Sequence, residues 1–368
     1  MPLASNLETL KHGQEPLWQG PSSDGANGGI TQSMLNQFLV CRERFRVRYV
    51  LGLQPADQFN NRLEYGSMWH ACEEGLAAKD EDPWARLDLY AGELLKRYPL
   101  QQEEILKWYE ICKIQFPIYV DYWAKHPDVL NRQPLLQEEV FNIPYKLPSG
   151  RTVRLRGKFD SVDLIDGGIW LQENKTKGDI DPQLLQRQLT FDLQTGVYLV
   201  ALNCNSHLRF GKDIAGVRYN VIRRPLAGGK GSIRQKKNQT QEEFYEELGE
   251  LIEDATGPEW GVLYDEHYFF MRWKVGFTPK DIENFKVKFL NPVLQQLVAW
   301  WDWISSATGS ANPFDPNWGS GNFGVHWQAP YGIYSSLYDG RPTEVDEYLA
   351  SGSTVGLRRA ESLFKELK

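Results

Sequence analysis

The hydrophobic pattern of this chain changes near residue 135, and that change constrains the fold more than any other feature. Before it, apolar residues recur at helical spacing through three segments, near 65–78, 83–98 and 102–125. After it, β-branched and aromatic residues alternate with period two over 137–145, 152–165 and 168–175. Turn sequences, Pro-Ser-Gly and Asp-Gly-Gly, separate these stretches. A long helical region followed by three strands predicts an α/β fold.

The rest of the chain supplies further helices and strands. Thr31 can cap a helix whose apolar residues repeat at three and four residues. Asp181 before Pro182 predicts a helix start, and that helix should continue to about residue 203. Strands are expected near 216–222 and 267–275, and helices near 241–255 and 279–305. We therefore expect a central mixed sheet of about five strands with flanking helices.

One folded domain is expected over residues 30–305, with a helical insertion at about 66–130. Residues 1–29 are polar and end in Ser-Ser-Asp-Gly-Ala-Asn-Gly-Gly, which is typical of a flexible N-terminal arm. Residues 306–368 are irregular and rich in Trp, Gly and Pro. We expect them to form a tail that packs on the domain.

Composition excludes several classes of protein. No stretch approaches the roughly 18 consecutive apolar residues of a membrane span, and the N-terminus lacks the pattern of a secretion signal, so a cytoplasmic location is expected. The four cysteines have no CxxC spacing, which argues against a disulfide framework or a zinc ribbon. A formal net charge of -7 argues against a protein that coats nucleic acid indiscriminately. Any contact with DNA must therefore be local.

A basic segment could provide such a local contact. Between Arg209 and Lys237 the sequence has nine Lys and Arg residues and one acidic residue. A second basic stretch covers residues 146–158. Either stretch could equally be a solvated face. A phosphate-binding role becomes the better interpretation beside a catalytic motif. The candidate DNA contacts in the longer segment are Arg223, Arg224, Lys230, Arg234, Lys236 and Lys237.

Charged residues also interrupt the predicted strands. Period-two alternation places Glu173 and Lys175 on one face of their strand, while Asp160 shares a face with Arg154, Arg156 and Lys158 on the strand before. Isolated charges are costly to bury, but two carboxylates around a divalent cation offset that cost. A nearby lysine can hold the attacking water or stabilise phosphate charge. Asp160, Glu173 and Lys175 are therefore the predicted catalytic residues of a metal-dependent phosphodiesterase.

These motifs resemble a known family. Gly157-Lys-Phe-Asp160, followed by Glu173-Asn-Lys175, resembles the PD-(D/E)XK nuclease superfamily, in particular its RecB-type, phage exonuclease-like branch. Gln194 and Tyr198 look like the QxxxY motif of that branch. His70 at the end of Gly-Ser-Met-Trp-His resembles its upstream metal-binding histidine, and residues 35–53 resemble its N-terminal helix.

The resemblance implies a restriction-endonuclease-like fold with its metal site on one edge of the sheet. Asp160, Glu173, His70 and the backbone carbonyl of Asn174 would bind Mg²⁺ or Mn²⁺, and Lys175 would act on the nucleophilic water. Gln194 and Tyr198 would contact the nucleic-acid backbone or brace the site. Taken singly, each motif has a simpler interpretation: a surface salt bridge for Glu173 and Lys175, a hydrogen-bonded histidine for His70, and packing for Gln194 with Tyr198.

The chain departs from the family in its cysteines. Many RecB-type members hold an iron–sulfur cluster with one cysteine near the N-terminal helix and three near the C-terminus. This chain resembles the CRISPR-adaptation nucleases but lacks the iron–sulfur cysteines. Cys41 sits where the first might be, but residues 312–334 contain none, so we predict no cluster and a buried, apolar Cys41. Trp318, Phe323, Trp327 and Tyr331 are expected to pack there, or alternatively to stack on unpaired bases.

The resulting prediction is a DNA exonuclease that acts on linear single-stranded or double-stranded ends in phage or bacterial recombination, repair or processing. Three alternatives remain open: a DNA-binding subunit without catalysis, an endonuclease for branched or foreign DNA, and an RNA nuclease. No membrane partner is expected. A ring-shaped homo-oligomer would be the expected route to processivity.

Overall fold

The computed structural model describes residues 16–55, 59–124, 131–178, 180–190, 192–226, 233–254, 269–305 and 344–367. The chain divides into two compact units. One unit comprises residues 1–58, 140–158 and 283–368, and the other comprises 59–139 and 159–282. We call the first the outer unit, because it contains both ends of the sequence, and the second the central unit, because it contains the middle of the sequence. The expected boundary at 305/306 stays a prediction, because residues 306–343 lie outside the described residues.

A five-stranded sheet has the order β2-β3-β4-β5-β6. β3 pairs antiparallel with β4, β4 pairs parallel with β5, and β5 pairs antiparallel with β6. The predicted α/β class with a mixed sheet is therefore confirmed. The strands are β2 (Arg132–Lys146), β3 (Thr152–Ile165), β4 (Gly168–Lys177), β5 (Ile214–Arg223) and β6 (Phe270–Gly276).

The connection from β4 to β5 is helical, as a parallel pair requires. The sequence predicted one helix here, and the described residues instead form two, α8 (Pro182–Thr190) and α9 (Leu193–Arg209). Asp181 caps the first helix, since its carboxylate accepts the Leu184 N–H at 2.9 Å. Asp192 starts the second by accepting from the backbone and the hydroxyl of Thr195, each at 3.2 Å. The second cap is the physical reason for the break.

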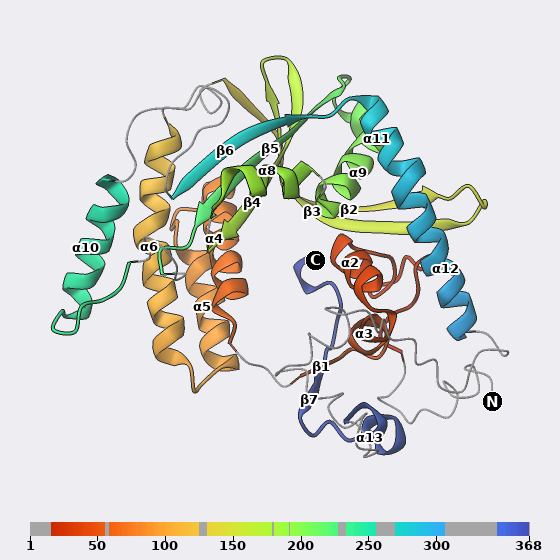
Figure 1. Cartoon of the computed structure of the whole chain (residues 1–368), viewed down its shortest axis with the longest axis horizontal. Coiled ribbons are helices and arrows are strands. Elements are labelled where there is room, and N and C mark those ends of the chain that lie inside the picture. Colours follow the sequence, from red (N-terminus) through yellow and green to blue (C-terminus); the bar gives the residue numbers. More distant parts are fainter. Residues whose placement is uncertain are drawn as a thin grey trace. The chain divides into compact units, whose positions relative to one another are not determined.

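Helices α4 (Asn61–Ala78), α5 (Ala85–Arg97) and α6 (Gln102–Ala124) pack against one another in the central unit, and α10 (Gln241–Asp254) lies against α6 (Figure 1). Their buried core includes Trp69, Trp108 and Phe116. The helical segments expected before residue 135 are confirmed, although α4 starts earlier, at the Asn60 cap that accepts from the Arg62 N–H at 3.1 Å.

The end of α4 contains a strained residue. Lys79, which is exposed, adopts a left-handed conformation with φ 56°. A side chain at such a position costs about 1 kcal/mol relative to glycine. We therefore expect Lys79→Gly to raise the free energy of unfolding by about 1 kcal/mol in urea denaturation. The adjacent Ala78→Gly is the matched control and should lower it by roughly 0.5–1 kcal/mol, because Ala78 is helical. A loss of stability in both variants would contradict this account.

The outer unit contains α2 (Gln32–Val40), α3 (Arg42–Phe45) and the π-helical turn Arg46–Val50. Thr31 caps α2 as predicted, accepting the Met34 N–H at 3.3 Å. The short strands β1 (Leu53–Pro55) and β7 (Leu357–Arg359) pair antiparallel, and α13 (Glu344–Ser351) precedes β7. The helical segment expected over 279–305 consists of α11 (Pro279–Phe285), a π-helical turn (Lys286–Leu290) and α12 (Asn291–Ser305).

Two expectations concern the N-terminal part of the chain: a flexible arm over residues 1–29 and a buried Cys41. The flexible arm predicted over residues 1–29 is wrong for residues 16–29, because Trp18 is buried and its indole N–H donates to the Gly29 carbonyl at 2.8 Å. The glycine and serine content of this segment had predicted flexibility and gave no indication that Trp18 is buried. Cys41 is buried in an apolar cluster with Val47 and Tyr348.

In the part of the chain that is described, no helix has the length and apolar character needed to cross a bilayer.

Candidate active site

Asp160 and Glu173 face each other across two neighbouring strands. β3 and β4 pair with Ser161 opposite Gln172, so one step further along the register Asp160 lies opposite Glu173. Asp160 Oδ2 accepts the Asn174 N–H at 2.8 Å, which holds this carboxylate against β4. β3 and β4 are interior strands. The expectation of a site at an edge of the sheet is therefore wrong, because β2 continues the sheet beyond β3.

Lys175, Glu173 and Gln194 form an interlocked cluster. The Lys175 ammonium lies 3.1 Å from Glu173 Oε2 and donates to Gln194 Oε1 at 2.7 Å. The Gln194 amide donates in turn to Glu173 Oε2 at 2.7 Å. The first two side chains share a face of β4, as alternation predicted, and α9 supplies the third. Gln194 thus fixes the relative positions of the acid and the amine.

The cluster leaves one carboxylate oxygen unsatisfied. Glu173 is fully buried, and within the described residues its Oε1 atom has no hydrogen-bond partner. Burial raises the pKa of Glu173 to about 8, Lys175 opposes that rise, and the Asp160 charge adds to it. For Lys175, burial lowers the pKa, but the Glu173, Asp192 and Asp160 charges raise it above its ordinary value. An orphaned carboxylate oxygen beside a second carboxylate suits a divalent cation.

The raised pKa of Glu173 predicts how stability of the metal-free protein depends on pH. Below its ordinary value of 4.5, Glu173 is protonated in both the folded and the unfolded chain. Between 4.5 and about 8 only the folded chain keeps the proton, so this group's stabilisation is lost as pH rises through that window. We expect Glu173→Gln to remove a slope of up to about 1.4 kcal/mol per pH unit from urea denaturation in EDTA. Parallel profiles for the two proteins would contradict this expectation.

A second group of ligand atoms converges on Asp160. One atom each from His70, Glu138 and Asp160 lies within 4.8 Å of the others. His70 Nδ1 is 4.0 Å from Asp160 Oδ1, and the imidazole is about one third exposed. His70 was predicted as a metal ligand, whereas Glu138 was given no role. The sequence did place Glu138 on the strand that precedes the one with Asp160. Only the pairing of those two strands brings the two carboxylates together.

Tyr198, Arg223 and Arg224 are buried, and none of them is placed as an exposed DNA contact. Tyr198 packs edge-to-face on Phe159, with ring centroids 5.6 Å apart. Arg223 donates to the Ile180 carbonyl at 3.4 Å, and Arg224 donates to the Arg62 carbonyl at 3.5 Å. Burial lowers the pKa of Arg224. The expected phosphate-binding role of the two arginines does not match this placement, because β5 carries Arg223 into the interior.

Three other predicted DNA contacts, Arg234, Lys236 and Lys237, are exposed on the segment before α10. Lys236 donates to Glu247 at 2.6 Å. Lys230 lies outside the described residues. In the second basic stretch, Arg154 donates to Asn142 at 2.9 Å and Arg156 donates to backbone carbonyls of residues 24–26. Those two arginines therefore support local structure in the outer unit.

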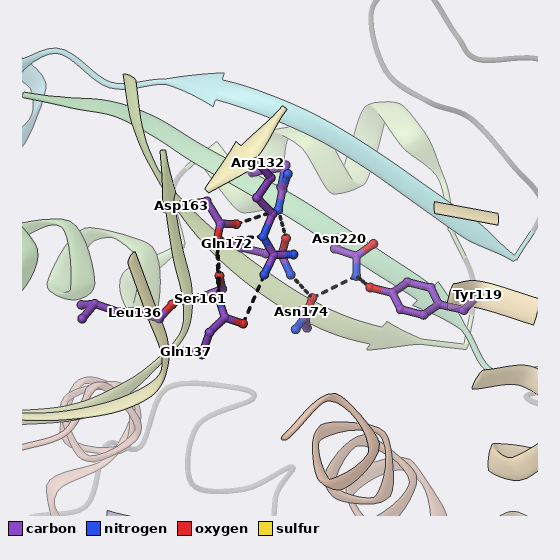
Figure 2. Close-up of polar contacts among 10 residues, drawn as sticks. Tyr119, Arg132, Leu136, Gln137, Ser161, Asp163, Gln172, Asn174 and Asn220 are labelled. Atoms are coloured by element: carbon purple, nitrogen blue, oxygen red, sulfur yellow. Dashed lines mark hydrogen bonds and ion pairs between the residues drawn. The ribbon is translucent and has the colours of Figure 1, made fainter. Parts of the chain in front are cut away.

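A buried polar network lies on the face of β4 opposite to Glu173 and Lys175 (Figure 2). Gln172 and Asn174 flank Glu173 and point to the opposite face of β4, where the Gln172 amide donates to Asn174 at 3.2 Å. Asn220 on β5 donates to Asn174 at 2.9 Å. Arg218, also on β5, contacts Gln172 and donates to Asp163 at 2.8 Å. The network fixes the strand segments on both sides of Glu173.

The family model of the PD-(D/E)XK nuclease superfamily matches residues 30–266. A search of curated proteins gives no significant match. The matched region carries Asp160, Glu173, Lys175 and Gln194 on the strands and helix described above, within a restriction-endonuclease-like mixed sheet. The class of enzyme is accordingly a nuclease. This chain belongs to the PD-(D/E)XK nuclease superfamily.

Proposed function

We propose that this protein is a Mg²⁺- or Mn²⁺-dependent deoxyribonuclease that degrades DNA from its ends. The observation that carries the proposal is the buried cluster of Glu173, Lys175 and Gln194 opposite Asp160, with the Glu173 Oε1 atom left unsatisfied. A surface salt bridge would not bury an acid that completely. The choice of an exonuclease of the RecB-type branch rests on the sequence resemblance.

Asp160 and Glu173 would hold the cation, together with the backbone carbonyl of Asn174 and the His70 imidazole. When bound, the cation would supply Lewis-acid polarisation of the phosphate and a lowered pKa for water. Hydrolysis forms one bond between the water oxygen and phosphorus, and it breaks one bond between phosphorus and the leaving sugar oxygen. Lys175 would orient the water and stabilise charge on the phosphate. Its ammonium is held 3.1 Å from Glu173 Oε2 and 2.7 Å from Gln194 Oε1, which supports this role.

DNA would be guided by exposed cations of the central unit. Arg234, Lys236 and Lys237 are exposed together, and phosphate contacts of this kind position DNA without reading its sequence. Lys230 belongs to the same stretch of sequence and is proposed as a further contact. Gln194 is proposed to brace the catalytic residues, since both ends of its amide are occupied by them. Tyr198 would brace α9 through Phe159.

The test uses purified full-length protein on three end-labelled or intact substrates: linear single-stranded DNA, linear duplex DNA and closed circular DNA. Each is incubated with Mg²⁺, Mn²⁺ or EDTA, beside the Asp160→Asn variant. The proposal is supported if only the linear substrates are degraded, only when metal is present, and only by the wild-type protein. Comparing the single-stranded and duplex linear substrates then gives the strand preference. Nicking of the circle would replace the exonuclease with an endonuclease. DNA binding without cleavage by either protein would leave a non-catalytic DNA-binding subunit.

The biological setting proposed for this activity is DNA recombination, repair or processing in a bacterium or a phage-infected cell. A homo-oligomer enclosing the DNA would make digestion processive. Sedimentation of the protein with and without linear duplex DNA would measure that assembly.

A further inference from the structure

Glu138 is the residue near the active centre whose role the family motifs did not supply. It lies on β2, beside β3 in the sheet. The preceding residue, Gln137, donates to Ser161 at 2.6 Å on the face of the sheet that carries the buried polar network. Glu138 has a backbone φ of 49°, which interrupts the regular alternation of β2, and its carboxylate lies within 4.8 Å of the ligand atoms of His70 and Asp160. Figure 2 shows Gln137 and Ser161 on that network side.

Three ligand types converge at this point. His70, Glu138 and Asp160 each bring one nitrogen or oxygen atom to within 4.8 Å of the other two. They come from α4, β2 and β3, which are different elements of the central unit. All three are at most partly exposed, so the donor atoms are held by a packed framework rather than by mobile surface side chains.

Glu173 is not one of the three residues of that group, and its Oε2 atom is engaged by Lys175 and Gln194. Its buried Oε1 atom is an independent indication that a ligand is required beside Asp160. Asp160 faces both places, with Oδ2 at the Asn174 N–H and Oδ1 4.0 Å from His70. A single carboxylate between two sets of ligands is the arrangement of a bridging residue.

We infer that Glu138 is a metal ligand, and that with His70 and Asp160 it forms a second divalent-cation site next to the one between Asp160 and Glu173. His70 then belongs to this second cation, and the first keeps Asp160, Glu173 and the backbone carbonyl of Asn174. This inference rests on the proposed function, which supplies the first cation. The second site combines an imidazole with two carboxylates. Nitrogen ligands favour transition cations over Mg²⁺ and Ca²⁺, so this site should bind Mn²⁺ more tightly than Mg²⁺.

Binding of Mn²⁺, followed by the electron paramagnetic resonance signal of the free ion, tests the inference without DNA or turnover. The wild-type chain is expected to bind about two Mn²⁺ ions, as two-metal centres do. Glu138→Gln should bind about one, or bind the second at least about tenfold more weakly. Glu139→Gln is the matched control, because it removes the same charge from the neighbouring position and its oxygens do not join the group. It should bind as wild type does.

Glu138→Asp guards against misfolding, since it keeps the charge and shortens the side chain by one methylene. It should give an intermediate Mn²⁺ affinity and an unchanged circular dichroism spectrum. Wild-type stoichiometry and affinity in Glu138→Gln would overturn the inference. A wild-type protein that cuts DNA but binds one Mn²⁺ would overturn the second site and leave the proposed function standing. A wild-type protein that binds two Mn²⁺ ions but cuts no DNA would support the second site and overturn the proposed function.

Discussion

Asp160→Asn is expected to lower the rate of DNA cleavage by about a thousandfold or more. A catalytic cation contributes several kcal/mol of transition-state stabilisation, and each 1.36 kcal/mol is about tenfold in rate. Asp160 is the acid that both groups of ligand atoms share, through its contacts with Asn174 and His70. An amide keeps the shape of the side chain but loses the charge that binds the cation. Its carbonyl oxygen can still accept the Asn174 N–H, so the fold should survive.

Initial rates on end-labelled linear duplex, at saturating Mn²⁺, measure this loss. The matched control is Asp166→Asn, which makes the same chemical change at an exposed turn on the same hairpin. That variant should keep the wild-type rate. Thermal unfolding of both variants separates loss of activity from loss of structure. More than a tenth of the wild-type rate in Asp160→Asn would show that Asp160 does not hold the essential cation.

Most of the proposed catalytic set was predictable because it depends on local pattern. Glu173 and Lys175 are two residues apart, so alternation alone places them on one face of β4, and the structure brings them to 3.1 Å. Asp160 lies on the adjoining arm of a hairpin with a short turn, which restricts the register. Gln194 needed the family resemblance, since it lies on the crossover helix, 21 residues beyond Glu173.

The proposed role of Glu138 could not be predicted from the sequence, because the proximity of Glu138 to Asp160 depends on how β2 pairs with β3. A shift of one residue in that pairing would move Glu138 to the opposite face, and no local pattern fixes it. A backbone φ of 49° at Glu138 also interrupts the regular alternation on which the sequence argument depends. Contacts between distant elements therefore had to come from the structure.

The basic segment shows the limit of charge counting. Arg218, Arg223 and Arg224 belong to the run of cations that predicted a DNA-binding surface, yet all three are buried. Composition cannot distinguish an arginine that meets phosphate from one that pairs with a buried acid or backbone carbonyl. The deciding fact is that β5 is an interior strand. Among the described cations of the segment, those that are exposed lie outside β5, at Lys212 before it and at Arg234, Lys236 and Lys237 after it.

Arg218→Met is expected to lower the free energy of unfolding by about 3–5 kcal/mol. The Arg218 and Asp163 side chains are both fully buried, and they are 2.8 Å apart. Removing one partner of such a pair leaves the other charge in the interior without its main counterion. Arg132 lies 2.9 Å from Asp163, which places the cost nearer the lower value. Urea denaturation of the two proteins at one pH measures the difference.

The pair itself should contribute far less than either single variant suggests. Burying two charges costs nearly as much solvation as their attraction returns, so an apolar pair of similar size can be almost neutral. We expect Asp163→Leu combined with Arg218→Met to recover more than half of the stability lost by Arg218→Met alone. Losses that simply add would contradict a direct interaction. Because Gln172 contacts Arg218 and adjoins Glu173, the recovered double variant also shows whether the network positions the catalytic strand. If the network positions β4, the double variant should recover its stability but cleave DNA more slowly than the wild-type protein.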